Sequence, residues 1–192
     1  MKYIITILIF FSIYCFSQEG MLYAKDNLEK ITSKNYDSNS TNIYIADIES
    51  IKTIIQKSGI KYKIVYNFSA TCPSSTESFP KIMEFLKTHN DFELIPIVGY
   101  RYTRFSEIKE YLEKIQYYSP VYFLDTELYG NKRNPFKRLD LLTKTICKDC
   151  IYQKMGFSSF YVLDQSNNVC AHNNWDIIGN EKMQQLYDLV NK

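Results

Sequence analysis

The sequence is poor in several features on which common functional classes depend. Its 192 residues include two histidines, six glycines and one tryptophan, and the formal net charge at pH 7 is only +2. No glycine-rich phosphate loop is present, and the carboxylates are scattered along the chain. Without a strongly basic balance there is no electrostatic argument for nucleic acid. The composition therefore argues against a phosphate-loop enzyme and against a nucleic-acid partner.

Long hydrophobic runs are also scarce, and the clearest one lies at the N-terminus. Residues 1–17 carry one lysine, an apolar stretch, and small residues near the end. This pattern is typical of a secretory signal peptide, and it is too short to span a membrane comfortably. We expect cleavage after Ser17, with Gln18 as the new N-terminus. The mature protein should then be exported, periplasmic or secreted, without stable membrane insertion.

The remainder predicts one polar leader and one domain. Residues 18–41 are polar and lack apolar periodicity, so we expect a flexible leader. Residues 42–192 are long enough for a single hydrophobic core. At 45% hydrophobic and 23% charged residues the chain has a globular composition, with no internal repeat and no second domain.

Cysteine is limited to five positions, and signal cleavage removes Cys15. A lipid anchor through Cys15 is disfavoured, because bulky Tyr14 stands before it where a small residue is expected. Four cysteines in an oxidising compartment permit three complete pairings, and the sequence leaves all three open. The four that remain are Cys72, Cys147, Cys150 and Cys170.

The main chemical signal lies in the stretch 62–80, YKIVYNFSATCPSSTESFP. β-Branched and aromatic residues at its start predict a buried strand, and apolar residues at its end recur at helical spacing. If Pro73 takes the first helical position, Cys72 becomes the N-cap. Its sulfur would then face the unpaired N–H groups of Ser74 and Ser75 and the positive end of the helix dipole. Both effects favour thiolate over thiol.

This stretch resembles the active-site segment of the thioredoxin fold, in particular the exported TlpA-like or redoxin branch. That pattern is a strand, Trp-Cys-x-x-Cys, and a helix with a proline eight residues after the first cysteine. Cys72 matches the first cysteine, and Pro80 matches the helix proline. Thr71 replaces the tryptophan, and Ser75 replaces the second, resolving cysteine. The resemblance therefore implies a one-cysteine version of the site.

The remaining elements follow the order of a thioredoxin domain. We expect an α/β, thioredoxin-like three-layer sandwich with a central mixed sheet and a TlpA-like insertion before the C-terminal hairpin. Pro96 predicts a bulge or an early strand end, because proline cannot donate to a ladder. The expected strands are 42–46, 62–68, 92–100, 120–125, 157–163 and 169–172; the expected helices follow Asp47, Cys72, Arg104, Asn134 and Gly179.

A second departure from the family pattern precedes the expected hairpin. Proteins of this fold usually carry Gly-x-Pro-Thr there, with a cis proline lying against the reactive cysteine. In this chain Ser158 stands at the proline position. A cis bond before serine would cost about 3 kcal/mol, so we expect a trans peptide or a local rearrangement. Access to Cys72 should then be freer for other thiols or for metal ions.

The leading functional hypothesis is thiol–disulfide exchange, with Cys72 as a nucleophilic thiolate. Its partners would be protein thiols or disulfides, or a small-thiol reductant. Without a cysteine at position 75, release of the mixed disulfide needs an external thiol or one of Cys147, Cys150 and Cys170. For the Cys147-x-x-Cys150 pair we favour a structural disulfide, within the pair or with Cys170.

Two other functions remain open. Loss of the tryptophan, the second cysteine and the cis proline is also what a catalytically degenerate binding module would show. A peroxiredoxin-like peroxidase is suggested by Ser69-x-x-Cys72-Pro, but Val65 stands where that family has proline. The sequence predicts no cofactor and no metal site, since one Cys-x-x-Cys with His172 is a weak zinc signal.

Overall fold

The computed structural model describes residues 22–130, 134–148, 150, 155–173, 177 and 180–190, and the expected signal peptide lies outside them. Within these residues, seven strands form one mixed sheet in the order β1-β2-β5-β4-β3-β6-β7. The strands from β1 to β3 in that order pair in parallel, whereas β6 and β7 are antiparallel. Their bounds are β1 Leu22–Tyr23, β2 Ile43–Ala46, β3 Tyr62–Phe68, β4 Phe92–Val98, β5 Val121–Leu124, β6 Phe160–Leu163 and β7 Val169–His172.

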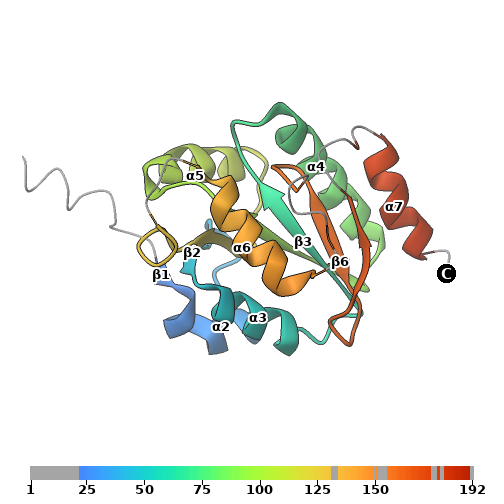
Figure 1. Ribbon diagram of the computed structural model, residues 1–192, viewed down its shortest axis with the longest axis horizontal. Helices are drawn as coiled ribbons and strands as arrows, with labels where there is room; N and C mark the ends of the chain where they lie inside the picture. The colour runs from blue at the N-terminus through green and yellow to red at the C-terminus, as the bar shows by residue number, and fades with distance from the viewer. Residues whose placement is uncertain are drawn as a thin grey trace, which may run out of the picture.

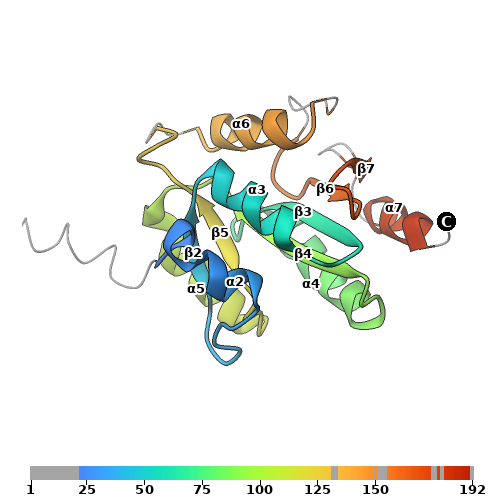
Figure 2. The ribbon, with the colours of Figure 1, turned by 90° about the horizontal axis from the view of Figure 1, so that it is seen from below.

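Helices cover both faces of this sheet (Figures 1 and 2). One hydrophobic cluster joins α2, α3 and α6 to the sheet, and a second cluster joins α4, α5 and α7 to the opposite face. This arrangement is the expected thioredoxin-like α/β fold. The helices are α2 Leu28–Thr32, α3 Ile48–Lys57, α4 Pro73–Thr88, α5 Phe105–Lys114, α6 Phe136–Ile146 and α7 Asn180–Val190, with 3₁₀ turns η1 Ala24–Asn27 and η2 Tyr102–Arg104. None of the helices in the described part of the chain is long and apolar enough to cross a membrane.

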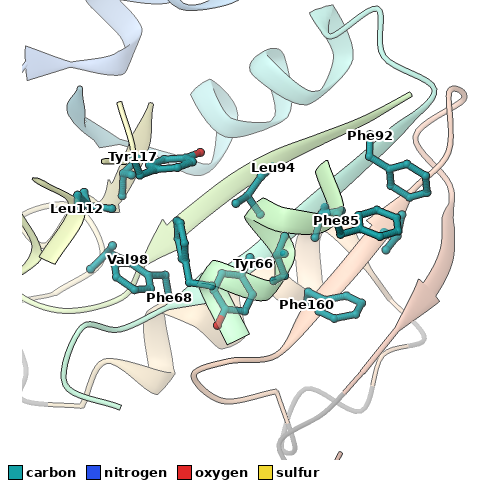
Figure 3. Close-up of a cluster of buried hydrophobic side chains, with 14 of the residues drawn as sticks. Tyr66, Phe68, Phe85, Phe92, Leu94, Val98, Leu112, Tyr117 and Phe160 are labelled. Atoms are coloured by element: carbon teal, nitrogen blue, oxygen red, sulfur yellow. The ribbon is translucent and has the colours of Figure 1, made fainter. Parts of the chain in front are cut away.

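Strand β3 is the central support of the site. Six of its seven residues are buried, and it pairs with both β4 and β6. Tyr66 and Phe68 point into the cluster of Figure 3, where both rings contact the Phe79 ring of α4 edge-on. These contacts stabilise the start of α4 against the end of β3. The residue that joins the two elements, Cys72, therefore stands on a rigid base.

The helix signals read from the sequence are confirmed at α3 and α4. Asp47 caps α3, and its Oδ1 accepts a hydrogen bond from the Ser50 N–H at 2.6 Å. Pro73 is the first residue of α4, with Cys72 at the N-cap. A side-chain oxygen at a cap satisfies an N–H group that the helix leaves unpaired, and proline lacks such an N–H group.

Pro96 corrects one expectation. The parallel register of β3 and β4 runs without interruption from Tyr62 opposite Phe92 to Phe68 opposite Val98, so no bulge forms. On its other side, β4 pairs with β5 only at Ile97 and Val98. Pro96 lies just before that ladder begins, where the missing N–H removes no bond to β5.

The segment expected as a flexible leader also differs from expectation. Its described part includes β1, which pairs with β2 at Leu22 opposite Tyr44, and helix α2. Ala24 and Ile31 from this segment are buried in the cluster that includes α3. The polar composition of this segment did not predict its packing on the domain, because only a few apolar side chains make the contacts.

Candidate functional site

Cys72 is half-buried at the N-cap of α4, four residues after Phe68, the last residue of β3. Its main-chain oxygen accepts hydrogen bonds from the N–H groups of Ser75 at 2.9 Å and Thr76 at 3.0 Å. Its side chain makes no capping hydrogen bond. The Ser75 N–H, which we expected to face the sulfur, is therefore engaged by the Cys72 carbonyl instead. The thiol remains available to other groups.

Ser75, at the position of the family's second cysteine, is fully buried. Its hydroxyl oxygen accepts a hydrogen bond from the Ser69 N–H at 3.0 Å and lies 3.1 Å from the Tyr66 hydroxyl. Tyr66 also donates to the main-chain oxygen of Ser75 at 3.0 Å. Ser75 thus closes the loop between β3 and α4.

Ser158 takes a conformation that proline could not adopt. Its φ is +72°, and the described residues contain no cis peptide bond. Its N–H donates to the main-chain oxygen of Asn67 at 2.7 Å, near the end of β3. Its hydroxyl donates to the main-chain oxygen of Ser74 at 2.9 Å, and the Ser74 hydroxyl in turn donates to Ser158 Oγ at 3.1 Å. The expected trans rearrangement is confirmed, and it brings Ser158 beneath the first turn of α4.

Lys182 is a site residue that the sequence reasoning missed. It lies on α7 and is 1% exposed. Its Nζ donates to Ser158 Oγ at 2.5 Å and, more weakly, to Ser74 Oγ at 3.5 Å. Burial lowers the pKa of Lys182 to about 8, against a smaller opposing effect of Cys72 and Glu77. One signal could have found it, because position 182 lies four and seven residues before buried Leu186 and Leu189, on the apolar stripe of α7.

Thr71 and Pro73 form the exposed rim of the site. The Thr71 hydroxyl lies 3.2 Å from the Tyr100 hydroxyl, which belongs to the segment after β4. The Tyr100 ring stacks on Phe157 at 4.7 Å between centroids, and Phe157 contacts Phe136 at 5.1 Å. Phe136, the first residue of α6, is 44% exposed. An aromatic surface therefore borders the cysteine loop.

The other cysteines in the described part of the chain do not lie at this end of the sheet. Cys147 and Cys150 form a disulfide with each other, which confirms the structural alternative that we favoured. The N-terminal turn of α6 borders the site through Phe136, whereas Cys147 follows the C-terminal end of the same helix. The two ends of this 11-residue helix are roughly 16 Å apart. Cys170 is on edge strand β7, and Lys63, at the start of β3, interacts electrostatically with it. Neither the disulfide nor Cys170 is therefore placed to resolve a bond at Cys72.

Comparison with known proteins gives structural matches only. No protein-family model matches the chain, and no curated protein matches it. The thioredoxin domain of a thiol-disulfide oxidoreductase from Bacteroides vulgatus is 17% identical with a TM-score of 0.49, over 69% of this chain and 81% of that one. A thiol:disulfide interchange protein from Chlorobium tepidum is 20% identical with a TM-score of 0.47, over 68% and 78%. At these identities and TM-scores the activities of those proteins are not transferred to this chain.

Proposed function

We propose that this chain acts in thiol–disulfide exchange through Cys72 alone. The Cys72 thiolate attacks one sulfur of a disulfide R–S–S–R′, a new bond forms between Cys72 and R–S, and R′–S⁻ leaves and takes a proton from water. An external thiol then attacks the mixed disulfide and returns Cys72 to its reduced form. The partners are protein thiols or disulfides, or a small-thiol reductant.

The observation that carries this proposal is the position of Cys72. The half-buried thiol stands at the N-cap of a 16-residue helix, and its side chain makes no capping hydrogen bond, so the sulfur remains available for reaction. The fully buried Ser75 cannot form a disulfide, and the other described cysteines lie elsewhere. These features favour a mixed disulfide that persists until another thiol arrives.

The test is reaction of the mature protein with glutathione disulfide, followed by mass spectrometry of the peptides. We expect one glutathione on Cys72, stable after removal of free disulfide and released by added dithiothreitol. Cys170→Ser is the matched control and should react at Cys72 unchanged, whereas Cys72→Ser should remain unmodified at that position. Absence of an adduct on Cys72 in the folded protein would refute the proposal and favour the binding-module function.

We also propose that the protein is exported after removal of residues 1–17. The support is the single lysine, the apolar run and the small residues of that segment. N-terminal sequencing of the protein secreted or released from the periplasm of a bacterial host should begin at Gln18. Recovery of chains that still begin at Met1 would contradict the proposal.

A further inference from the structure

Lys182 is a buried cation without a carboxylate partner in the described part of the chain. Its side chain is 1% exposed, and its hydrogen-bond acceptors are the hydroxyls of Ser158 and Ser74. None of the ion pairs between described residues includes it. Buried ammonium groups are usually paired with an anion, because desolvation of an isolated charge is costly. The positive charge of Lys182 therefore requires a negative charge among the titratable groups that face it.

The charged and titratable groups around Lys182 come from α4 and β3. On α4, Cys72 and Glu77 interact with it electrostatically. Glu77 is exposed, and its carboxylate lies 2.7 Å from Lys81 Nζ, so much of its charge is already compensated. On β3, the Tyr66 hydroxyl lies 3.5 Å from Ser158 Oγ, and burial raises the pKa of Tyr66, which keeps it neutral. Cys72 is then the half-buried group that can supply the missing negative charge.

Ser158 explains how the ammonium group is held there. A proline at this position would offer no side-chain acceptor, whereas the Ser158 hydroxyl accepts from Lys182 and donates to the main-chain oxygen of Ser74. Ser74 is the second residue of α4, two residues after Cys72. The serine at the proline position and the buried lysine thus form one unit beneath the cysteine loop.

We infer that Lys182 is a positioning residue for Cys72, whose buried ammonium group stabilises the thiolate that the proposed exchange reaction requires. The inference rests on the proposed function in one respect, because the Cys72 thiolate that Lys182 stabilises is the nucleophile of the exchange reaction. When Cys72 ionises, its proton passes to water and Lys182 keeps its own. No other reactant is involved. The positive charge then lowers the free energy of the thiolate relative to the thiol.

The first test measures the rate of iodoacetamide alkylation as a function of pH in the mature chain. The chain carries Cys170→Ser, so that alkylation reports on Cys72. We expect Lys182→Met to raise the midpoint of the profile by about half to one pH unit, because the nearby positive charge is lost. Lys182→Arg should restore part of the shift, since arginine remains charged. Lys87→Met, at the opposite end of α4 and paired with exposed Glu84, is the matched control and should leave the midpoint unchanged.

The second test is reciprocal and keeps Lys182 in place. Coupling between two ionisations is mutual, so Cys72→Ser should lower the NMR titration midpoint of the Lys182 ε-methylene by an amount similar to the first shift. This arm remains informative if Lys182→Met does not fold. An unchanged Lys182 midpoint in Cys72→Ser would overturn the inference, as would an unchanged alkylation profile in folded Lys182→Met.

The two proposals fail in different ways. If the midpoints shift but no glutathione adduct forms on Cys72, the coupling stands and the exchange function is wrong. If the adduct forms at Cys72 and neither midpoint moves, exchange stands and the role of Lys182 is wrong.

Discussion

Ser158 donates a hydrogen bond from its hydroxyl to the main-chain oxygen of Ser74 at 2.9 Å, although the two residues are 84 positions apart. The bond joins the loop before β6 to the first turn of α4. It also places a hydroxyl where the thioredoxin family usually has a proline ring. The polar surroundings of Cys72 are therefore built in part by contacts between segments that are far apart in the sequence.

Ser158→Pro should destabilise the fold severely. Proline fixes φ near −65°, whereas this position has a φ of +72°, and the Ser158 N–H that bonds to Asn67 would be lost. We expect a loss of about 3 kcal/mol or more in the free energy of unfolding, measured with urea. Ser158→Gly accepts the same φ and should lose only the contacts of the hydroxyl, which cost about 1.5–3 kcal/mol because one of them is to the Lys182 ammonium group. Equal losses in the two variants would contradict the conformational argument.

Ser75→Cys should change how the mixed disulfide is resolved. A thiol at position 75, one helical turn after Cys72, could attack the Cys72 sulfur and release the bound thiol without an external reductant. Glutathione on Cys72 should then disappear spontaneously and leave a disulfide between positions 72 and 75, detectable by mass spectrometry. The Ser69 N–H loses its acceptor, so we also expect a stability loss of about 1–2 kcal/mol. An adduct that persists as in the unchanged chain would show that position 75 cannot reach the sulfur.

Tyr66→Phe should be more destabilising than Tyr44→Phe, although both rings are almost completely buried. The Tyr66 hydroxyl bonds to Ser75, and its removal leaves the main-chain oxygen of Ser75 without that donor. We expect a loss of about 1–3 kcal/mol on urea unfolding. The Tyr44 hydroxyl has no hydrogen-bond partner among the described residues, so its removal should be close to neutral. Similar losses for both variants would show that the Tyr66 contact adds nothing to stability.

The free energy of unfolding should increase at alkaline pH because of Lys182. The unfolded chain keeps the Lys182 proton up to about pH 10.5, whereas the folded chain releases it near pH 8, so the unfolded state binds more protons between these values. The contribution of Lys182 to stability therefore increases as pH rises from about 8 to about 10.5, is lost as pH falls back through this range, and is constant below it.

The measurement is the difference in free energy of unfolding between the unchanged chain and Lys182→Met at pH 7 and at pH 10. This difference removes contributions from groups that both proteins share, including the buried tyrosines. We expect the unchanged chain to gain stability relative to Lys182→Met between the two values. Lys87 is exposed at the C-terminal end of α4, and Lys87→Met should show no such change. A constant difference across this range would refute the burial of a charged Lys182.

Much of the fold follows from local sequence patterns. The run of β-branched and aromatic residues at 62–68 matches β3, and Pro73 at the start of a helical pattern placed Cys72 at the N-cap. Asp47 likewise marked the start of α3. These signals are reliable because caps, proline positions and apolar periodicity act within a few residues.

Other features could not be read in this way. Pro96 was expected to interrupt β4, but the effect of a missing N–H depends on which neighbouring strand lies beside it. Strand β1 and helix α2 fold onto the sheet through few apolar residues in a polar segment. Lys182 lies on the apolar stripe of α7, but only the packed structure shows that its ammonium group reaches Ser158.

By itself, the sequence determined the position of Cys72 between a buried strand and a proline-led helix, and the absence of a cysteine at position 75. Only the tertiary structure decided which groups surround that sulfur. It brings Ser158 and Lys182 from distant segments beneath the loop and leaves the Cys147–Cys150 disulfide at the far end of α6. The reason is physical: capping and periodicity are local, whereas the charge and solvation of a thiol depend on every element packed against it.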